Sequence, residues 1–433
     1  MLINLNNIIS AKFILIFTTS IFSNFVNLIV LIISARNFSD LEFGYLAISQ
    51  TIFLIFYSLS FHNAHMYLHK ILSLNIEKGI SQMSSIFIIR FYAASFLYLI
   101  LCIVMILLNI NNDLKILILC FNIIILIEPF TIVYSYFFIK KKFFLLSKIS
   151  IFQSLFFFTM KVFVVLQYKN IFFLGFCYVL EYIFFALVLI YFDNKNKKIF
   201  KKFKFEVYEI FNTFRQIYLF PFLSIFTLVA LRIDVIMLAS MMSEADAGIY
   251  SVSSRLIGIF LLFGTTFLTL VYPEFARNQN KYIFQKNFEM LLSLSIFISC
   301  IIIFIIFIFG NYYLILFGEI FSNSLDTLKI LSINILLGFI VMTWTNKQYI
   351  DGNYFIIIIF LSLAILLNIV LNYYLIPILF LNGSAIATTL SMLIALKLCL
   401  VFNRQDLKSI FYSFSFLRII IATKKIFRIK LLK

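Results

Sequence analysis

The sequence predicts an all-α polytopic membrane protein of about twelve transmembrane helices, built as two six-helix bundles. The chain of 433 residues is 63% hydrophobic and has a mean hydropathy of +1.08, far above the values of a soluble domain. Apolar runs long enough to cross a bilayer, which takes about 20 residues, recur along the whole chain. The motif Ser-acid-x-acid-x-Gly begins at Ser39 and again at Ser243, 204 residues later. A spacing near half the chain length indicates a duplicated unit.

The predicted spans follow from the apolar runs. Because the bilayer core holds no water, backbone groups there must bond to one another, and single runs of this length do so as helices. The first run lacks a small-residue cleavage site, so we interpret it as a retained helix and not as a signal peptide. The twelve runs lie at residues 13–33, 45–66, 86–108, 114–138, 146–166, 171–192, 216–240, 247–271, 288–309, 326–345, 354–376 and 381–402.

The distribution of basic residues predicts the orientation. With the N-terminus in the cytoplasm, 26 of the 35 Lys and Arg residues fall in inside segments, and only Arg36, Lys115 and Lys169 fall in outside loops. This asymmetry follows the positive-inside rule and places both termini in the cytoplasm. The net charge of +17 is therefore explained by topology and by attraction to anionic membrane lipids, and it does not indicate a nucleic-acid partner.

The same frame predicts the domain organisation. Residues 1–192 form an N-terminal six-helix bundle, 193–215 a basic cytoplasmic linker, 216–402 a C-terminal six-helix bundle, and 403–433 a basic cytoplasmic tail. Both halves begin inside, so the repeat is parallel, and each motif copy caps the first hairpin of its half on the outer face. The tail is too short and too charged to span, and we expect an interfacial helix there.

Polar residues inside the spans are candidates for ligand contact, because each is costly in lipid unless it is paired or lines water. Ser20, Ser23, Asn24 and Asn27 share one face of the first helix. Asn368 and Asn372 form a similar pair one turn apart near the C-terminus. For any single residue, a hydrogen bond between helices is an equally good explanation. Stripes on several helices together favour an aqueous cavity between the halves.

Three charges at similar depth, Arg232, Asp234 and Arg255, point to an anionic ligand. Asp234 lies ten residues before the turn at Glu244 and Arg255 lies eleven residues after it. At about 1.5 Å per residue, both stand roughly 15 Å from that turn. Two arginines and one aspartate leave one positive charge over, which suits an anion. A structural Asp234–Arg255 pair is the alternative.

Two further acids, Glu128 and Glu181, lie near the middle of their spans with no obvious partner in sequence. Such carboxyl groups could carry a proton and are candidate ion-coupling residues. By contrast, Arg90, Lys161, Lys329 and Lys397 lie close enough to helix ends to snorkel. His62, His65 and His69 share one helix face, and we interpret them as interfacial residues and not as a metal site.

At these residues the chain resembles the Wzx-type polysaccharide-biosynthesis flippases of the multidrug/oligosaccharidyl-lipid/polysaccharide (MOP) exporter superfamily. The resemblance lies in the stretches Arg36 to Tyr45, Arg232 to Leu256, and Leu371 to Pro377 with Asn382 to Thr388. It implies a MOP/MATE-like fold of two bundles that alternate between inward-open and outward-open states. It also implies a multi-pass protein of the bacterial inner membrane and no cofactor.

The resemblance further implies the cargo and the roles of the candidate residues. The cargo would be an undecaprenyl-diphosphate-linked sugar repeat unit for O-antigen, lipopolysaccharide or capsule assembly, with a polysaccharide polymerase downstream. Arg232 and Arg255 would meet the diphosphate, and Asn24, Asn27, Asn368 and Asn372 would contact the sugar. Glu128, Glu181 and Asp234 would couple transport to an ion gradient.

Three alternatives differ in what they require. The multidrug branch typically carries a cation-site acid in its first helix, where this chain has Asn24. Lipid II flippases have fourteen spans. A membrane glycosyltransferase or polymerase could use Asp40 and Glu42 as an acid-x-acid metal motif, but it usually needs a large outer loop. N-capping of a helix explains the second copy of the motif better, so we expect no enzyme.

Overall fold

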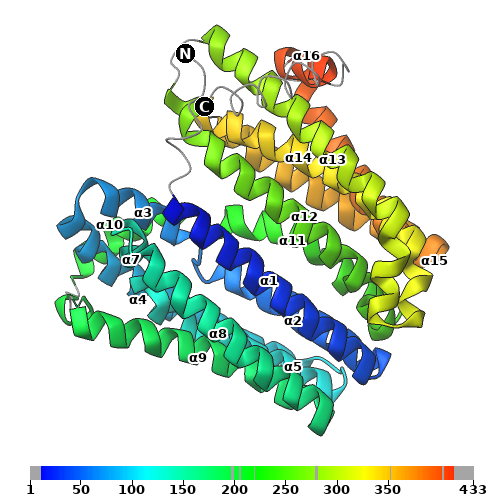
Figure 1. Ribbon diagram of the computed structural model, residues 1–433, viewed down its shortest axis with the longest axis horizontal. Coiled ribbons are helices and arrows are strands. Elements are labelled where there is room, and N and C mark those ends of the chain that lie inside the picture. The colour runs from blue at the N-terminus through cyan, green and yellow to red at the C-terminus, as the bar shows by residue number, and fades with distance from the viewer. Residues whose placement is uncertain are drawn as a thin grey trace. The chain divides into compact units, whose positions relative to one another are not determined.

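The computed structural model describes residues 11–196, 199–203, 206–218, 220–277, 281–351, 353–401 and 404–413. Helices and short turns account for these residues, and no strand occurs among them (Figure 1). The chain divides into two compact units, Ser10–Ile236 (the first unit) and Met237–Lys433 (the second unit). This division falls inside one helix, and the predicted boundaries of bundles, linker and tail stay predictions. Most of the tail lies outside the described residues.

The first unit is a bundle of long helices with shorter ones at one end (Figure 1). The helix α1 packs against α8, and α2 packs against α5. Its elements are α1 (Ala11–Asn37), α2 (Asp40–Leu59), α3 (Ala64–Leu74), α4 (Ile76–Leu107), α5 (Asn112–Asn122), α6 (Ile124–Ile127), the 3₁₀ segment η2 (Glu128–Ile132), α7 (Val133–Ile139), α8 (Phe143–Phe163), the π-helical segment η3 (Val164–Tyr168), α9 (Ile171–Asn196), η4 (Phe200–Lys202) and α10 (Val207–Ile217).

The second unit is built around α14, which packs against α12, α13 and α15. Trp344 of α14 lies at the centre of an apolar cluster with Phe288 of α13 and Phe360 of α15. The elements are α11 (Phe220–Met241), which begins in the first unit, α12 (Glu244–Arg277), α13 (Lys281–Phe317), η5 (Glu319–Ser324), α14 (Leu325–Asp351), α15 (Tyr354–Val401) and α16 (Arg404–Ser413).

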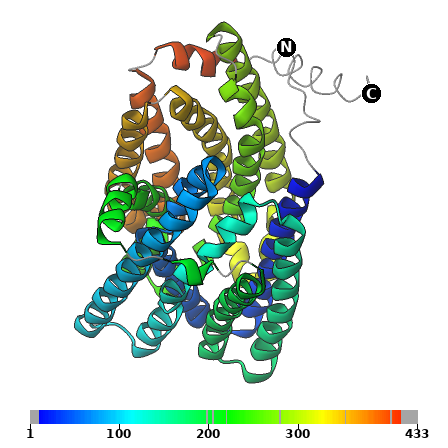
Figure 2. The ribbon, with the colours of Figure 1, turned by 90° about the vertical axis from the view of Figure 1, so that its left-hand side faces the viewer.

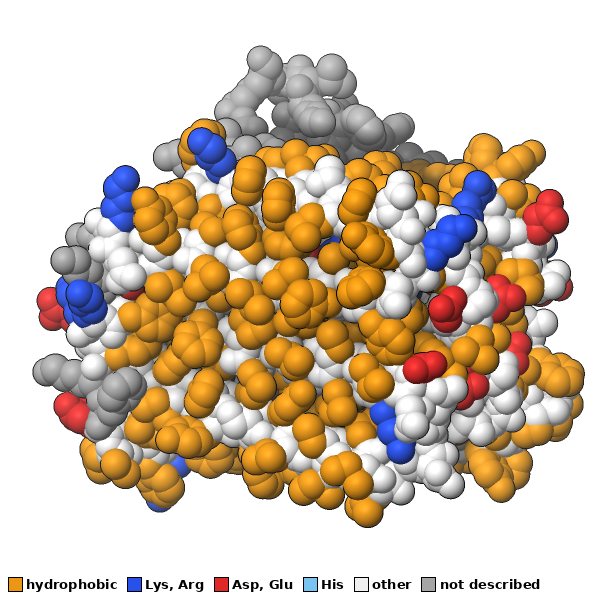
Figure 3. Space-filling view, turned by 90° about the horizontal axis from the view of Figure 1, so that it is seen from below, with side chains coloured by type: hydrophobic (Ala, Val, Ile, Leu, Met, Phe, Trp, Pro, Cys, Tyr) orange, Lys and Arg blue, Asp and Glu red, His pale blue; other side chains and the backbone are white. Residues whose placement is uncertain are grey.

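Many of these helices are suited to a bilayer. Among the described residues, eight helices are long and apolar enough to cross a membrane. Large apolar side chains on their outer faces are exposed, including Phe152, Phe156, Phe173, Phe176 and Phe304. Figure 3 shows one such face, where apolar side chains cover the middle and most charged ones lie towards the edges. The protein is therefore a multi-pass membrane protein, whereas the total of twelve spans stays a prediction.

The second predicted span, 45–66, differs from the structure. The helix α2 ends at Leu59, and Phe61 has a φ of 61° in the turn that follows. A non-glycine residue in this left-handed region interrupts a helix. The chain resumes as α3, whose Leu68 and Leu72 are buried against Met83 of α4. The turn therefore carries His62 and the new helix carries His65 and His69, so the three histidines do not share one helix.

The long element α15 is two helices joined by a tight turn. Phe380 has φ 53° and ψ −130°, far from helical values. The Asn368 amide donates to the Thr388 hydroxyl at 3.2 Å, although the two are 20 residues apart, so the chain folds back on itself. Gly383 allows this close approach, because a Cβ there would lie 2.2 Å from the carbonyl oxygen of Leu375. The two predicted spans 354–376 and 381–402 are the arms of this hairpin.

Both copies of the Ser-acid-x-acid-x-Gly motif are helix N-caps. Ser39 caps α2, where its hydroxyl accepts from the Glu42 amide and the Glu42 carboxylate accepts from the Ser39 amide at 2.9 Å. Ser243 precedes α12 in the same way, with its hydroxyl accepting from the Asp246 amide at 3.1 Å and donating to the Asp246 carboxylate at 2.6 Å. The capping explanation for the second copy is confirmed.

A short surface helix is docked at the end of each unit. In the first unit α10 packs against α4, where the Ser81 hydroxyl donates to the Glu209 carboxylate (Figure 2). In the second unit α16 packs against α13, where Ser409 donates to the Glu289 carboxylate at 3.2 Å and accepts from the Gln285 amide at 2.6 Å. The predicted seventh span also starts later than expected, since α11 begins at Phe220.

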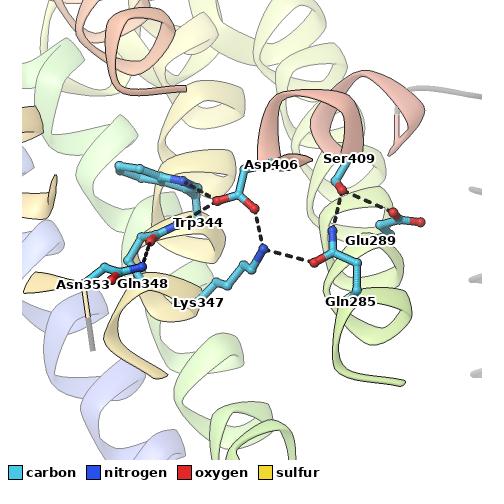
Figure 4. A network of polar contacts seen from close by, with 8 residues as sticks. All are labelled: Gln285, Glu289, Trp344, Lys347, Gln348, Asn353, Asp406 and Ser409. Carbon is cyan, nitrogen blue, oxygen red and sulfur yellow. Dashed lines mark hydrogen bonds and ion pairs between the residues drawn. The ribbon is translucent and has the colours of Figure 1, made fainter. Parts of the chain in front are cut away.

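The helix α16 is held mainly by one buried acid, Asp406 (Figure 4). Its carboxylate accepts from the Trp344 indole at 3.2 Å and from the Gln348 amide at 2.7 Å, and it pairs with the Lys347 ammonium. Lys347 also donates to Gln285 at 3.0 Å. Three donors from α14 thus satisfy one carboxylate, which makes its burial tolerable.

Candidate functional site

The three charges predicted to meet an anion lie on α11 and α12. Asp234 is buried, and Arg232 and Arg255 are partly buried. Arg232 and Asp234 belong to the first unit and Arg255 to the second. Arg255 interacts electrostatically with Tyr313 of α13, whose hydroxyl donates to the Val252 carbonyl at 3.3 Å. The roles assigned to these three residues from the sequence stay predictions.

A second cluster joins two residues for which the sequence predicted different roles. The Lys161 ammonium of α8 lies 2.5 Å from the Glu181 carboxylate of α9 and 3.4 Å from the amide oxygen of Asn27 on α1. It also lies 3.6 Å from the centre of the Tyr178 ring. Lys161 is 1% exposed, so the expectation that it snorkels is wrong. Burial without this carboxylate and this ring would be costly for an ammonium group.

The third cluster surrounds Glu128 at the break between α6 and α7. Its Oε1 atom accepts from the Arg90 guanidinium of α4 and lies 2.8 Å from Nδ1 of His62. The ring of His62 stacks on Tyr57 of α2, with centroids 4.2 Å apart. Arg90 and Glu128 are both 3% exposed at the side chain. The expectation that Arg90 snorkels is therefore wrong.

The same two clusters correct the expectation that Glu128 and Glu181 lack partners, since each forms an ion pair. The reason is topological: the partners come from other helices, 38 and 20 residues away in the chain. The available signal was the presence of one cation and one acid at comparable depth in neighbouring spans. Matching one buried cation with one buried acid at similar depth would have predicted both ion pairs. Considered alone, each cation suggested snorkelling and each acid suggested an unpaired proton-binding group.

The backbone explains why Glu128 is placed inside the bundle. The predicted span 114–138 is interrupted by Pro129, which cannot donate a helical hydrogen bond, and residues 128–132 form the 3₁₀ segment η2. The first residue of this segment, Glu128, is directed into the bundle and is buried. Its second oxygen, Oε2, has no hydrogen-bond partner among the described residues.

The four predicted asparagines separate into two groups. On α1, Asn24 is exposed and Asn27 contacts Lys161. On α15, Asn368 and Asn372 are buried and bonded to each other at 2.9 Å within one helix arm. Asn368 also donates to Thr388 on the other arm, which is the bond between helices named above as the alternative. Sugar contact by these residues stays a prediction. In the described part of the chain no group of His, Cys, Asp and Glu could hold a metal ion.

Comparison with known proteins gives a consistent fold. No family model and no curated protein sequence matches the chain. Several solved structures are similar to it. One is an inward-facing multidrug-resistance MATE family transporter of the MOP superfamily (TM-score 0.72, 11% identity, covering 91% of this chain and 96% of that one). The inward closed form of the lipid II flippase MurJ is also similar (TM-score 0.61, 16% identity, 97% of each chain). A MOP superfamily transporter from Pyrococcus furiosus is a third (TM-score 0.58, 12% identity, 92% and 94%).

The chain has the fold of the MOP superfamily transporters. At identities of 11–16% this likeness concerns the fold. The proteins that share it are transporters and flippases and not enzymes. On this MOP fold, Glu128 and Glu181 lie in the first unit, each beside a buried cation, and Arg255 lies in the second.

Proposed function

We propose that this protein flips undecaprenyl-diphosphate-linked oligosaccharide repeat units from the cytoplasmic to the outer leaflet of the bacterial inner membrane. The product would serve O-antigen or capsular polysaccharide assembly, with a polysaccharide polymerase consuming it on the outer side. Transport would proceed by alternating access of the two six-helix bundles. The MOP fold supports the proposal, because lipid II flippase and drug exporters are both built on it.

The observation that carries the choice of cargo is the balance of the three charges predicted to lie at similar depth in α11 and α12. Arg232 and Arg255 provide two permanent cations for the single acid Asp234 inside apolar helices. A guanidinium binds phosphate oxygens with two parallel hydrogen bonds, so this excess suits a diphosphate. Asn24, Asn27, Asn368 and Asn372 would contact the sugar.

The energy for transport would come from an ion gradient. Glu128, Glu181 and Asp234 are the proposed ion-coupling residues, and each lies in a helix of the predicted membrane region. Both ion pairs, Arg90–Glu128 and Lys161–Glu181, can in principle exchange a partner when a proton or another cation arrives. Such an exchange would link ion binding to helix position.

Export of cationic drugs is the second candidate, because the MATE transporter gives the higher TM-score, 0.72 against 0.61 for MurJ. The charge balance argues against it, since two partly buried arginines against one aspartate repel a cationic drug. Purified protein with bound ligand separates the two. Native mass spectrometry should detect undecaprenyl-diphosphate oligosaccharide in preference to the monophosphate, and no cationic dye. Dye binding without lipid binding would support the drug exporter.

Replacing Arg255 provides the sharpest test of the diphosphate contact. Arg255→Ala should abolish lipid-linked sugar translocation in proteoliposomes, because the cation that meets the diphosphate is lost. Arg255→Lys should keep part of the rate, since an ammonium supplies the charge without the bidentate geometry. Equal amounts of monodisperse, membrane-inserted protein are the control. Full transport by Arg255→Ala with only reduced stability would show that Arg255 is structural.

A further inference from the structure

We propose that His62 is a proton-binding residue, with Glu128 as its fixed counter-ion and Arg90 and Tyr57 completing the site. The inference rests on the proposed gradient-driven function, because it names the coupling ion as the proton and places it on an imidazole. The sequence pattern alone had assigned His62 to the interface and the proton to Glu128.

Hydrogen bonding fixes where a proton can go. A guanidinium stays charged at all ordinary pH values, so Arg90 beside Glu128 keeps that carboxylate ionised. An ionised carboxylate only accepts, so Nδ1 of His62, 2.8 Å away, must carry a hydrogen and donate it. The free lone pair of the neutral ring is then on Nε2, which lies 3.4 Å from the Tyr57 hydroxyl.

Proton uptake at Nε2 forms one N–H bond and adds one positive charge. The incoming proton bonds to Nε2, and the Tyr57 hydroxyl turns from donor to acceptor. No other covalent bond forms or breaks. The cluster changes from neutral, with Arg90 balancing Glu128, to one net positive charge.

Access distinguishes His62 from the other members of the cluster. Its side chain is 31% exposed, whereas those of Glu128 and Arg90 are 3% exposed. The imidazole therefore joins water at the surface to an ionised carboxylate in the interior. It lies in the turn after α2, at the end of the unit that the charge distribution predicts to be cytoplasmic. This is the arrangement of a proton entry site.

Of the charged groups beside His62, the Glu128 carboxylate favours its protonation and the Arg90 guanidinium, which pairs with the same oxygen, opposes it. Tyr57 faces His62 from α2, Arg90 from α4, and Tyr182 with Glu181 from α9, where Lys161 balances Glu181. On α3, burial lowers the pKa of His65 to about 4, and burial also lowers the pKa of His69. Burial therefore favours the neutral form of both imidazoles, which lessens their repulsion of a proton on His62.

The position of Glu128 gives the proton a mechanical consequence. Glu128 is the first residue of η2, the proline-containing break in the helix of residues 112–139. His62 lies in the turn between α2 and α3. A charged His62 holds Glu128 more strongly than a neutral one. Protonation thus tightens the contact between α2 and the break. If proton binding at His62 changes the affinity for a ligand that favours one geometry of the break, that ligand changes the proton affinity of His62 by the same factor.

The test is a titration of the imidazoles by ¹⁵N NMR on the full protein in nanodiscs. The chain has three histidines, so a tag without histidine leaves three ring signals. His69→Gln and His65→Gln assign the third signal, and His69→Gln is the milder of the two, because Nδ1 of His65 lies 2.9 Å from the His62 carbonyl oxygen. The expected result is that, on acidification, the His62 ring takes up a proton before the rings of His65 and His69 do. Glu128→Gln should then move its midpoint about one unit lower, because the counter-ion is lost.

Tyr57→Phe is the matched control, since it removes a hydroxyl but no charge, and it should move the midpoint much less than Glu128→Gln. A His62 ring that stays neutral to pH 5, or a midpoint unchanged by Glu128→Gln, overturns the proposal. The titration is independent of transport. If His62 titrates as stated and no lipid is translocated, the site stands and the proposed function fails. Translocation whose pH profile ignores His62→Gln contradicts the site alone.

Discussion

Three pairs of opposite charge are largely buried in the described part of the chain. Arg90–Glu128 and Lys161–Glu181 lie in the first unit, and Lys347–Asp406 lies in the second. Unpaired, each ion would cost several kcal/mol of solvation free energy. The presence and approximate depth of Glu128 and Glu181 could be predicted from the sequence, whereas Asp406 was not singled out. Their partners could not, because a pair between helices leaves no spacing signal along the chain.

His65 predicts a pH dependence of stability. Burial lowers its folded-state pKa from 6.5 to about 4, so the unfolded state binds the proton more readily. Stability contributed by the neutral ring is complete above about pH 7 and is lost as pH falls through 6.5 towards 4. We expect about 2 kcal/mol less unfolding free energy at pH 5 than at pH 7.5.

Thermal unfolding in detergent at the two pH values measures this loss. The variant His65→Gln keeps a polar side chain of similar size but cannot take up a proton. It should therefore lose less stability on acidification than the wild-type protein. Equal losses in both proteins would show that burial of His65 is not the cause.

Among the elements, the hairpin of α15 depends on one glycine. A Cβ on Gly383 would lie 2.2 Å from the Leu375 carbonyl oxygen, so Gly383→Ala must open the turn at Phe380. We expect a loss of about 2 kcal/mol. Gly258→Ala in α12 is the matched control, since its Cβ would meet no described atom within 4 Å. Chemical denaturation of both variants checks this, and a Gly383→Ala protein as stable as the control contradicts the tight turn.

The docking of α16 depends on Asp406, and the chain's single tryptophan reports it. Trp344 donates its indole hydrogen to Asp406, so Asp406→Asn should change the emission of Trp344 and detach Lys347. The expected loss of stability is about 3 kcal/mol, because one partner of a buried pair remains without its counter-ion. Fluorescence and thermal unfolding measure the two effects.

Lys408→Gln is the control for this element, because Lys408 is an exposed charge on the same helix. It should leave both the emission and the unfolding temperature close to the wild-type values. If Asp406→Asn behaves like Lys408→Gln, then α16 is not held by the contacts in Figure 4.

At the scale of the whole molecule, the two units carry signs of one duplicated plan. The caps at Ser39 and Ser243 stand 204 residues apart, and so do Ser81 of α4 and Gln285 of α13, which hold α10 and α16. The duplication could be predicted from the cap motif, because its chemistry is local. A helix was expected in the tail, where α16 lies, but α10 was not expected within the predicted linker, and the contacts of both helices depend on a neighbouring helix.

The sequence also predicted an all-α membrane fold, and the MOP-like structure agrees with it. Apolar length decides that outcome, because a bilayer admits few alternatives for such runs. The break at Phe61 and the separate helix α3 were missed. The apolar residues of α3 pack against protein and not against lipid, and hydropathy does not distinguish these two environments.

The most direct measurement of the central claim is a sidedness assay in proteoliposomes. Labelled undecaprenyl-diphosphate oligosaccharide is placed in the inner leaflet, and its appearance in the outer leaflet is followed with and without a pH gradient. The account predicts appearance that depends on the gradient and on Arg255. The contradicting result is a protein that moves no lipid-linked sugar under either condition and instead releases a cationic dye.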